Sequence, residues 1–258
     1  MNKISDPSES LRRTIETHSF FKEIPVDVTN SLVKSAQVRE YSKGKILFLE
    51  GEQPLRFYFI INGWIKLFKG NSRGDEAVIQ MLGKGDTAGG SAVFLNTSYP
   101  ISAQVVEDST LISFPGSIIR NFICDNNQLA INMLITISKQ SQKLFHLLES
   151  TRLKSAEERV GWYLLKLLLD QGKYEDAIRL PYDKSTIASY LDMKPETFSR
   201  TLKKFKQQGF RIENDTIVLP EVSALCSYCD VETASNCSKH LTDECSNPQD
   251  IEGIRNFN

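Results

Sequence analysis

Short apolar runs separated by glycines dominate the first half of the chain. Residues 57–61 and 64–68 are apolar runs on either side of Asn62-Gly63, a dipeptide typical of tight hairpin turns. Residues 76–82 and 101–106 are further strand candidates. Short strands with turns at this spacing predict a small antiparallel barrel or jelly roll, a β-roll, with a hairpin at Asn62-Gly63.

Helical patterns lie before and after this region. Residues 11–21 predict a short lead-in helix, and residues 127–151 predict a long one. The long helix has a heptad-like seam made of Ala130, Leu134, Ile137, Ser141, Leu144 and Leu148. Such a seam fits either an ordinary core helix or a parallel dimer contact. Three apolar side chains lie off the seam and are expected to pack against the roll: Met133, Ile135 and Phe145.

Residues 183–208 predict two short helices joined by a tight turn. Asp183 is a candidate N-cap for the first helix, because its carboxylate can accept from free N–H groups. Its apolar face comprises Ile187, Ala188 and Leu191. Residues 192–194 form the turn, and Pro195 suits the first turn of the second helix because its missing N–H costs nothing there.

The second helix, from Pro195 onward, is strongly amphipathic. Phe198, Leu202 and Phe205 form a buried stripe at spacings of four and three. The opposite side carries Glu196, Ser199, Arg200, Lys203, Lys204 and Lys206. In a DNA major groove a carboxylate can accept from cytosine, and an arginine can bind guanine with two hydrogen bonds. An amphipathic surface helix with solvated lysines is the alternative interpretation.

Two further patterns flank this helix pair. Ser155 and Glu158 have the spacing of a capping box, which predicts that a helix begins there and ends near 171–172. Residues 210–219 predict a β-hairpin with Asn214-Asp215 at its tip.

Composition and charge narrow the class of protein. The 258 residues have 40% hydrophobic and 24% charged residues, as in ordinary globular proteins. No apolar run reaches the roughly 18 residues of a membrane span, and the first residues lack the apolar core of a secretory signal. We therefore expect a cytoplasmic protein without membrane contact. Residues 194–211 contain six basic residues and one acidic residue, a balance of +5 in a chain of net charge −1, which favours nucleic acid.

Four of the five cysteines lie in the last 33 residues, spaced C-x2-C-x7-C-x7-C: Cys226, Cys229, Cys237 and Cys245. A C-x2-C pair lets two thiolates reach one metal, and zinc and iron–sulfur clusters both accept four thiolates. His240 could replace one ligand. Structural disulfides are not expected in a cytoplasmic chain. The fifth cysteine, Cys124, is expected to be a buried small apolar residue.

The second helix of the pair resembles a known motif. Residues 195–200, PETFSR, are similar to the E-x-x-S-R recognition-helix motif of the CRP/FNR superfamily of bacterial transcription regulators, in its FNR-type branch. The resemblance covers residues 20–219. It implies an α+β chain with a cyclic-nucleotide-binding-like β-roll (jelly roll), a dimerisation helix and a winged helix-turn-helix. The expected divisions are a lead-in (1–20), β-roll (21–126), dimerisation helix (127–152), DNA-binding domain (153–222) and cysteine-containing tail (223–258).

The resemblance also implies how the protein binds DNA. Glu196, Ser199 and Arg200 would read base edges, and Lys203, Lys204 and Ser185 would contact phosphates. The target would be a palindromic double-stranded site with FNR-like half-sites, TTGAT and ATCAA. A homodimer held by the long helix would bind it, since two recognition helices one DNA turn apart, ~34 Å, can read a palindrome. RNA polymerase is the further partner that the resemblance implies.

Members of this superfamily differ in the signal to which they respond. Members that bind cyclic nucleotides need a glutamate and an arginine where this chain has Gly90 and Ile101, which argues against cyclic AMP. FNR-type regulators are known for oxygen-labile 4Fe-4S clusters, and a minority branch places its cysteines after the winged helix. The tail cysteines are therefore expected to hold an iron–sulfur cluster that senses oxygen, nitric oxide or redox state. The alternatives are a structural zinc tail with haem or a small molecule in the β-roll, or thiols without metal.

An enzyme would need catalytic groups that the sequence does not bring together. No nucleophile–base pair or glycine-rich phosphate loop accompanies the cysteines, and His18, His146 and His240 are scattered along the chain. We therefore expect a regulator and not an enzyme.

Overall fold

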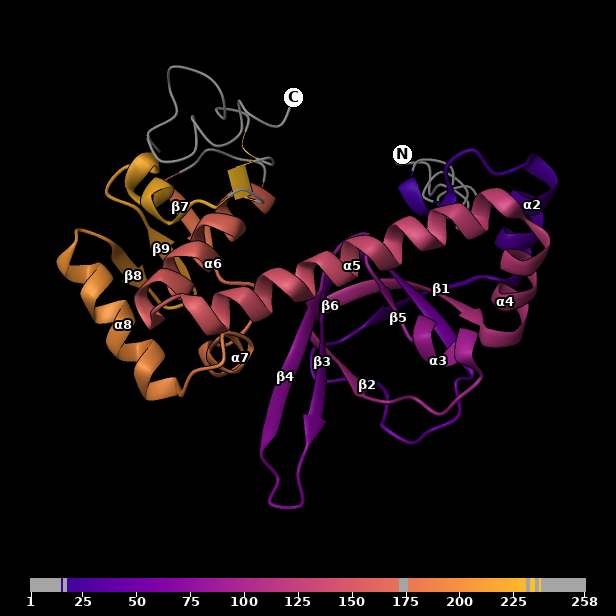
Figure 1. Ribbon diagram of the computed structural model, residues 1–258, viewed down its shortest axis with the longest axis horizontal. Coiled ribbons are helices and arrows are strands. Elements are labelled where there is room, and N and C mark those ends of the chain that lie inside the picture. The colour runs from indigo at the N-terminus through magenta and orange to yellow at the C-terminus, as the bar shows by residue number, and fades with distance from the viewer. Residues whose placement is uncertain (1–14, 16–17, 172–175, 231–232, 235–236, 238–258) are drawn as a thin grey trace, which may run out of the picture. The chain divides into compact units, whose positions relative to one another are not determined.

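The computed structural model describes residues 15, 18–171, 176–230, 233–234 and 237 (Figure 1). The chain divides into two compact units, residues 1–146 and residues 147–258. Helix α5 (Asn127–Leu153) begins in the first unit and ends in the second, so the long helix predicted over 127–151 is confirmed. In the described part of the chain, no helix has both the length and the apolar character of a membrane span.

The first unit is an antiparallel sheet with helices packed on it. Its elements before α5 are η1 (Ser19–Phe21), α2 (Val26–Ser35), β1 (Gln37–Tyr41), β2 (Ile46–Phe48), β3 (Arg56–Gly70), β4 (Glu76–Leu82), β5 (Thr87–Ala88), α3 (Gly90–Leu95), β6 (Ser102–Pro115) and α4 (Gly116–Asp125). The strand order is β1-β6-β3-β4, with β2 also paired to β6 and β5 also paired to β3. This jelly-roll-like arrangement confirms the predicted β-roll. Of the lead-in helix predicted over 11–21, most residues lie outside the described part of the chain.

The hairpin predicted at Asn62-Gly63 is wrong. β3 continues from Arg56 to Gly70 without a turn and pairs with β6, with irregular register between residues 60 and 65. Gly63 has φ +89°, and a Cβ there would overlap Ser109 Oγ and lie 2.7 Å from Asp108 O. The glycine therefore forms a bulge in a continuous strand, where the backbone of β6 leaves no room for a side chain.

The turn that ends β3 lies further along the chain. Asn71 N donates to Asp75 O at 3.0 Å, and Asn71 Oδ1 accepts from the backbone N–H groups of Arg73 and Asp75. Gly74, with φ +83°, supplies the left-handed residue. β3 and β4 form the long hairpin that extends from the first unit (Figure 1).

β3 contributes side chains to two cores, and the bulge shifts which face its later residues occupy. Before it, Phe57 and Phe59 face the helices, while Tyr58 and Ile60 face the interior of the roll, because side chains alternate along a strand. After the bulge the alternation is shifted by one, so Ile65 also faces the interior. Without that shift, Ile65 would leave the roll interior.

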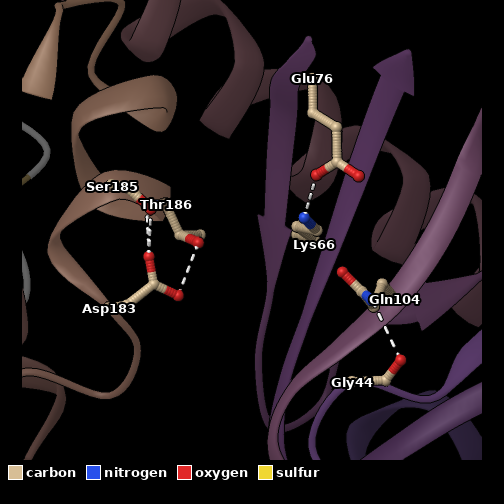
Figure 2. Close-up of polar contacts among 7 residues, drawn as sticks. All are labelled: Gly44, Lys66, Glu76, Gln104, Asp183, Ser185 and Thr186. Carbon is tan, nitrogen blue, oxygen red and sulfur yellow. Dashed lines mark hydrogen bonds and ion pairs between the residues drawn. The ribbon is translucent and has the colours of Figure 1, made fainter. Parts of the chain in front are cut away.

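Polar contacts join β3 to β4, and β6 to the turn between β1 and β2 (Figure 2). Lys66 on β3 is 8% exposed and forms an ion pair with Glu76 on β4, and its ammonium lies 4.6 Å from the centroid of the Phe68 ring. Gln104 Nε2 on β6 donates to Gly44 O at 3.0 Å. A buried lysine is tolerated in the roll because the carboxylate pairs with it.

The first half of α5 contacts the roll through a mixed face. Met133 is buried against the roll as predicted, whereas Ile135 and Phe145 are exposed, so the predicted packing of those two is wrong. Further along the helix, Gln140 Nε2 donates to Thr87 O at 3.0 Å, and Lys143 forms an ion pair with Asp86 at 2.8 Å. Polar residues thus face the roll in this part of α5, where the sequence pattern predicts apolar ones.

The predicted burial of Cys124, near the end of α4, is wrong. Cys124 is exposed, not buried, because the buried face of α4 is set by Ile119 and the partly buried Phe122 and Ile123. One residue further along the helix points away from that face.

The second unit is a winged helix-turn-helix. After α5 it comprises α6 (Ala156–Asp170), β7 (Ala177–Arg179), α7 (Lys184–Tyr190), α8 (Pro195–Gln207), β8 (Arg211–Glu213), β9 (Thr216–Val218) and η2 (Val222–Tyr228). The three strands form a sheet in the order β7-β9-β8. Ser155 and Glu158 form the predicted capping box. Asn214, with φ +50°, lies at the tip of the predicted wing.

Candidate nucleic-acid interface

A capped first turn begins the helix-turn-helix. Asp183 Oδ1 accepts from Thr186 N at 2.9 Å and from Ser185 Oγ at 2.5 Å, and Oδ2 accepts from Thr186 Oγ1 at 3.0 Å (Figure 2). Partial burial raises the pKa of Asp183, but these hydrogen bonds outweigh it and hold the pKa below its usual value. The predicted N-cap is confirmed.

The turn between α7 and α8 is tight. Met193 N donates to Ala188 O at 3.0 Å, and Asp192 has φ +51°. Leu191 is fully buried at the end of α7, and Pro195 occupies the first turn of α8 as predicted. The turn therefore fixes where α8 begins.

The inner side of α8 is anchored by the predicted stripe. Phe198 and Phe205 are fully buried, and Leu202 is 5% exposed. The ring of Phe205 meets the ring of Phe210, at the start of the wing, edge to face with 5.1 Å between centroids. Packing on one side of the helix directs its other side to solvent.

The outer side of α8 holds the residues predicted to contact DNA. All of them are exposed: Glu196, Ser199, Arg200, Lys203, Lys204 and Lys206. The structure thus brings the predicted base-reading and phosphate-contacting residues of α8 onto one solvent-facing surface. An exposed, basic helix face beside a wing can enter a major groove.

Two of the predicted phosphate contacts already have partners within the unit. Lys204 Nζ pairs with Glu157 Oε2 at 3.0 Å, and Glu157 Oε1 also accepts from Gln208 Nε2 at 2.9 Å. The Ser185 hydroxyl, at the start of α7, donates to Asp183. The Ser185 hydroxyl has one proton and would have to exchange its acceptor to donate to a phosphate. The Lys204 ammonium has further N–H donors, but its charge is partly balanced by Glu157, whereas Lys203 has an exposed side chain on the same face.

Behind the helix pair lies a buried tyrosine cluster. Tyr163 and Tyr182 share a hydroxyl–hydroxyl hydrogen bond of 2.7 Å, and the rings of Tyr163 and Tyr190 meet edge to face at 6.1 Å. Burial raises the pKa of both Tyr163 and Tyr182 far above the usual value. These phenols are neutral scaffold groups that fix α6 against the helix-turn-helix.

The start of the cysteine tail packs on the same unit. Cys226, Cys229 and Cys237 are partly exposed, whereas Cys245 and His240 lie outside the described residues. Tyr228, between the first two cysteines, fills the space beside Gly161 on α6, where a Cβ would overlap its ring. This contact is not among those predicted from the sequence, although an isolated glycine within a helical pattern indicates close approach of another group.

The β-roll positions that bear on a cyclic nucleotide are also defined. Gly90 begins α3, and Ile101 directly precedes β6. Close to them, the ring of Tyr99 stacks on Phe48 with 3.9 Å between centroids, and its hydroxyl donates to Arg56 O at 2.6 Å. This part of the roll interior is filled by aromatic side chains.

A β-roll in one unit and a winged helix-turn-helix with an exposed basic helix in the other define a two-part DNA-binding regulator. Residues 38–126 match the family model described as a cyclic nucleotide-binding domain, and residues 158–228 match the Crp-like helix-turn-helix domain. The chain belongs to the Crp/FNR family of transcription regulators. Members of this family bind DNA and act as dimers, and they are not enzymes.

Individual relatives agree with this assignment. The chain is 23% identical over 209 residues to the CRP-like cAMP-activated global transcriptional regulator of Mycobacterium tuberculosis, covering 80% of this chain and 93% of that protein. It is 24% identical to the transcriptional activator protein FnrA of Stutzerimonas stutzeri, covering 78% and 83%. The structure of FixK2 from Bradyrhizobium japonicum shares the fold, with a TM-score of 0.67, 21% identity, and coverage of 76% and 98%.

Proposed function

We propose that this regulator binds a palindromic, FNR-like DNA site as a dimer, reading it with Glu196, Ser199 and Arg200. The observation that carries the proposal is the exposure of these three side chains on the first turns of α8, directly outside its buried stripe. A carboxylate four residues before an arginine presents an acceptor and a forked donor side by side, which suits a C·G and a G·C pair. Lys203 adds a sequence-independent phosphate contact, and RNA polymerase is the expected downstream partner.

Replacement of Arg200 tests this assignment. Arg200→Ala should cost about 1–3 kcal/mol per half-site and relax the preference for one G·C pair, since the lost contact is specific to a base. Fluorescence anisotropy with TTGAT/ATCAA duplexes and single-base variants measures both effects. Arg39→Ala, which removes an exposed arginine of β1 in the other unit, is the matched control. Unchanged affinity and unchanged base preference in Arg200→Ala would refute the assignment.

The sensing group is proposed to be an iron–sulfur cluster held by Cys226, Cys229, Cys237 and Cys245. Four thiolates suit such a cluster, which would supply reactivity toward oxygen or nitric oxide. Among the described residues no three cysteine, histidine or acidic side chains gather as a metal site, and Cys245 lies outside them. Two observations support the fit: Cys226 and Cys229 are partly exposed, and Cys229 N donates to Cys226 O at 3.1 Å, so one tight turn carries both.

Asp230 is not expected to join this ligand set. Its carboxylate pairs with Lys154 Nζ at 2.8 Å and accepts from Thr233 N at 3.0 Å. Burial raises the pKa of Asp230, but the hydrogen bonds from Lys154 and Thr233 outweigh it and keep the pKa below its usual value. The carboxylate is therefore engaged in holding the tail.

Cyclic AMP is not expected to be the effector of the β-roll. Ile101 offers no charge to a cyclic phosphate, and burying an unpaired phosphate is costly. The stacked Tyr99 and Phe48 occupy the adjoining interior, with the Tyr99 hydroxyl already bonded to the backbone of β3. Calorimetric titration with cyclic AMP should show no binding. The Mycobacterium tuberculosis relative, described as cAMP-activated, provides the positive control.

The second candidate keeps the same DNA-binding unit but gives the tail a structural zinc and the β-roll a haem or small-molecule effector. The same partly exposed cysteine pair supports it, because zinc also accepts four thiolates. Anaerobic purification with a visible spectrum and iron, sulfide and zinc analysis separates the two. A brown protein bleached by air supports the cluster. A colourless protein with one zinc per protomer would contradict it and move the search for the signal to the β-roll.

A further inference from the structure

The turn that carries the first two cysteines is part of the packing of the winged-helix unit. Tyr228 lies in η2 between Cys226 and Cys229, and its ring takes the place that a side chain on Gly161 of α6 would need. The same ring lies 5.7 Å, centroid to centroid, from Phe205 on the inner side of α8. One side chain of the cysteine turn therefore contacts both α6 and the DNA-reading helix.

Polar contacts extend this link to the C-terminal end of α8. The Tyr228 phenol shares a hydrogen bond with Gln208. Gln208, which caps the end of α8, donates in turn to Glu157 at the start of α6, and Glu157 also pairs with Lys204 of α8. The tyrosine thus adjoins a network that fixes the last turn of α8 to the first turn of α6.

The other side of the cysteine turn is anchored separately. Asp230, directly after Cys229, pairs with Lys154, whose ammonium lies 5.3 Å from the centroid of the Trp162 ring on α6. The backbone on either side of the turn is thereby held, by buried Leu225 before it and by Asp230 after it. A change in the separation of the Cys226 and Cys229 backbones must therefore be absorbed by the two residues between them, Ser227 and Tyr228.

We propose that Tyr228 is a positioning residue that couples the state of the Cys226–Cys229 turn to helix α8 within one protomer. The inference rests on the proposed function, in which these cysteines hold the sensing group. When two thiolates bind one group, the intervening backbone is constrained, and the Tyr228 ring is directed against Gly161 and Phe205. When the two thiolates bind no common group, the Tyr228 ring is no longer held in this position. The end of α8 then loses the constraint that the ring provides. Control of DNA binding then acts inside each winged-helix unit.

The test compares DNA affinity in three states of the full-length chain. The background is Cys124→Ser, because Cys124 is exposed and would also react with thiol reagents. Each protein is prepared anaerobically with iron and sulfide, then stripped with a chelator, then alkylated with iodoacetamide. Dissociation constants for one cognate duplex are measured in each state, with metal analysis and circular dichroism alongside. The parent should show a difference of roughly 5- to 150-fold between states.

Four variants separate coupling from folding. Tyr228→Ala removes the ring and Gly161→Ala displaces it, and both should bring the ratio of dissociation constants between states close to one while leaving the iron content unchanged. Tyr228→Phe keeps the ring and should keep the ratio. Ser227→Ala, at the exposed neighbouring position, should behave like the parent. If Tyr228→Ala does not fold, Gly161→Ala provides the test of the coupling. Alanine has a high helix propensity, so this substitution is compatible with the helical backbone of α6.

The outcomes for the coupling and for the cluster are distinguishable. The coupling is overturned if a folded Tyr228→Ala or Gly161→Ala keeps the parent's ratio, or if the parent binds DNA equally in all three states. The cluster proposal fails if the parent takes up no iron. In that case alkylation can still test the coupling. If alkylation changes the DNA affinity of the parent but not that of Tyr228→Ala, the coupling is supported without the cluster.

Discussion

At the start of α7 a single carboxylate closes the first turn of the helix-turn-helix. Asp183→Ala should destabilise the winged-helix unit by about 1 kcal/mol, because Thr186 N loses its acceptor. Asp183→Asn keeps the cap and should cost less. Urea denaturation at pH 7, followed by circular dichroism, measures both. Equal stability of the wild type and Asp183→Ala would show that the cap contributes nothing.

The same carboxylate gives a pH dependence with a defined sign. The pKa of Asp183 is lowered in the folded state, so its stabilising effect is complete above the unfolded value of 3.8. The effect is lost as pH falls through the lower folded pKa. The stability difference between the wild type and Asp183→Asn should therefore shrink as pH falls below that unfolded value. A difference that stays constant down to pH 2 would contradict a lowered pKa.

Residues whose role is local were predictable from the sequence. The N-cap, the N-terminal proline and the capping box involve partners within three residues, so sequence spacing alone predicts them. These residues are Asp183, Pro195 and the Ser155–Glu158 pair. The Lys204–Glu157 pair joins residues 47 apart, and the Tyr228–Phe205 contact joins residues 23 apart. Such contacts depend on how the elements pack, which a single sequence does not reveal.

At the scale of elements, Gly63 decides the course of β3. Gly63→Ala should cost about 2–5 kcal/mol, because it adds a strained positive φ to overlap with Ser109 and Asp108. Gly44→Ala is the matched control, with φ +90° and no atom within 4 Å of the added Cβ, and should cost about 1–2 kcal/mol. Denaturation midpoints and slopes in urea measure both. Equal losses would show that the contact with β6 is unimportant.

The wrong hairpin at Asn62-Gly63 has a physical reason. A glycine with positive φ serves a two-residue turn and a bulge equally well, and apolar runs flank it in both cases. What separates the two is the partner: β6 is long enough, Ser102–Pro115, to pair with both halves of β3. The apolar pattern predicts only residues 101–106 of that partner as a strand, which is too short to pair with a continuous β3.

The outer face of α8 makes a prediction about two neighbouring lysines. Lys203→Ala should weaken binding to all DNA sequences alike and reduce the slope of log affinity against log salt by about 1. Lys204→Ala should have a smaller effect, because its ammonium already pairs with Glu157. Glu157→Gln should enlarge the effect of removing Lys204. Titrations against cognate and random duplexes between 50 and 200 mM salt, roughly the range over which phosphate contacts are resolved, measure these slopes.

Lys34→Ala is the control for this series, since it removes an exposed lysine from α2 in the other unit. It should leave the salt slope unchanged. Equal slopes for Lys203→Ala and Lys204→Ala would mean that the Glu157 pair does not hold in the DNA complex. A sequence-dependent effect of Lys203→Ala would mean that this lysine reads bases as well.

For the whole molecule, the order of parts was predictable from the residue patterns together with the family resemblance. Short apolar runs between glycines predicted the β-roll, and the heptad-like seam predicted the long helix. The two short helices before a hairpin became a winged helix-turn-helix only through the resemblance of residues 195–200, and all three parts agree with the structure. The attachment of the tail did not follow, because residues 223–230 contain no periodic pattern. Their position depends on Leu225, Tyr228 and Asp230, each of which contacts a distant residue.

The exposure of the α5 seam distinguishes its two interpretations, an ordinary core helix and a parallel dimer contact. Leu134, Ile137, Leu144 and Leu148 are all exposed in the single chain, so the interpretation as an ordinary core helix does not hold for this seam. Four large apolar side chains in heptad-like register on a solvent-facing stripe are costly to leave in water. A second copy of the chain, packed in parallel along α5, would cover them, as expected for a family whose members act as dimers.

Leu134→Glu tests this arrangement, because Leu134 is the most exposed residue of the seam at 64%. A charge there should repel its counterpart across a parallel dimer and give a monomer in sedimentation velocity. Loss of the second half-site should weaken binding to the palindrome by roughly 10²- to 10⁴-fold, while each monomer still binds a single half-site weakly. Leu95→Glu, at the exposed end of α3, is the matched control and should remain dimeric. A dimeric Leu134→Glu with wild-type affinity would place the dimer contact elsewhere than this seam.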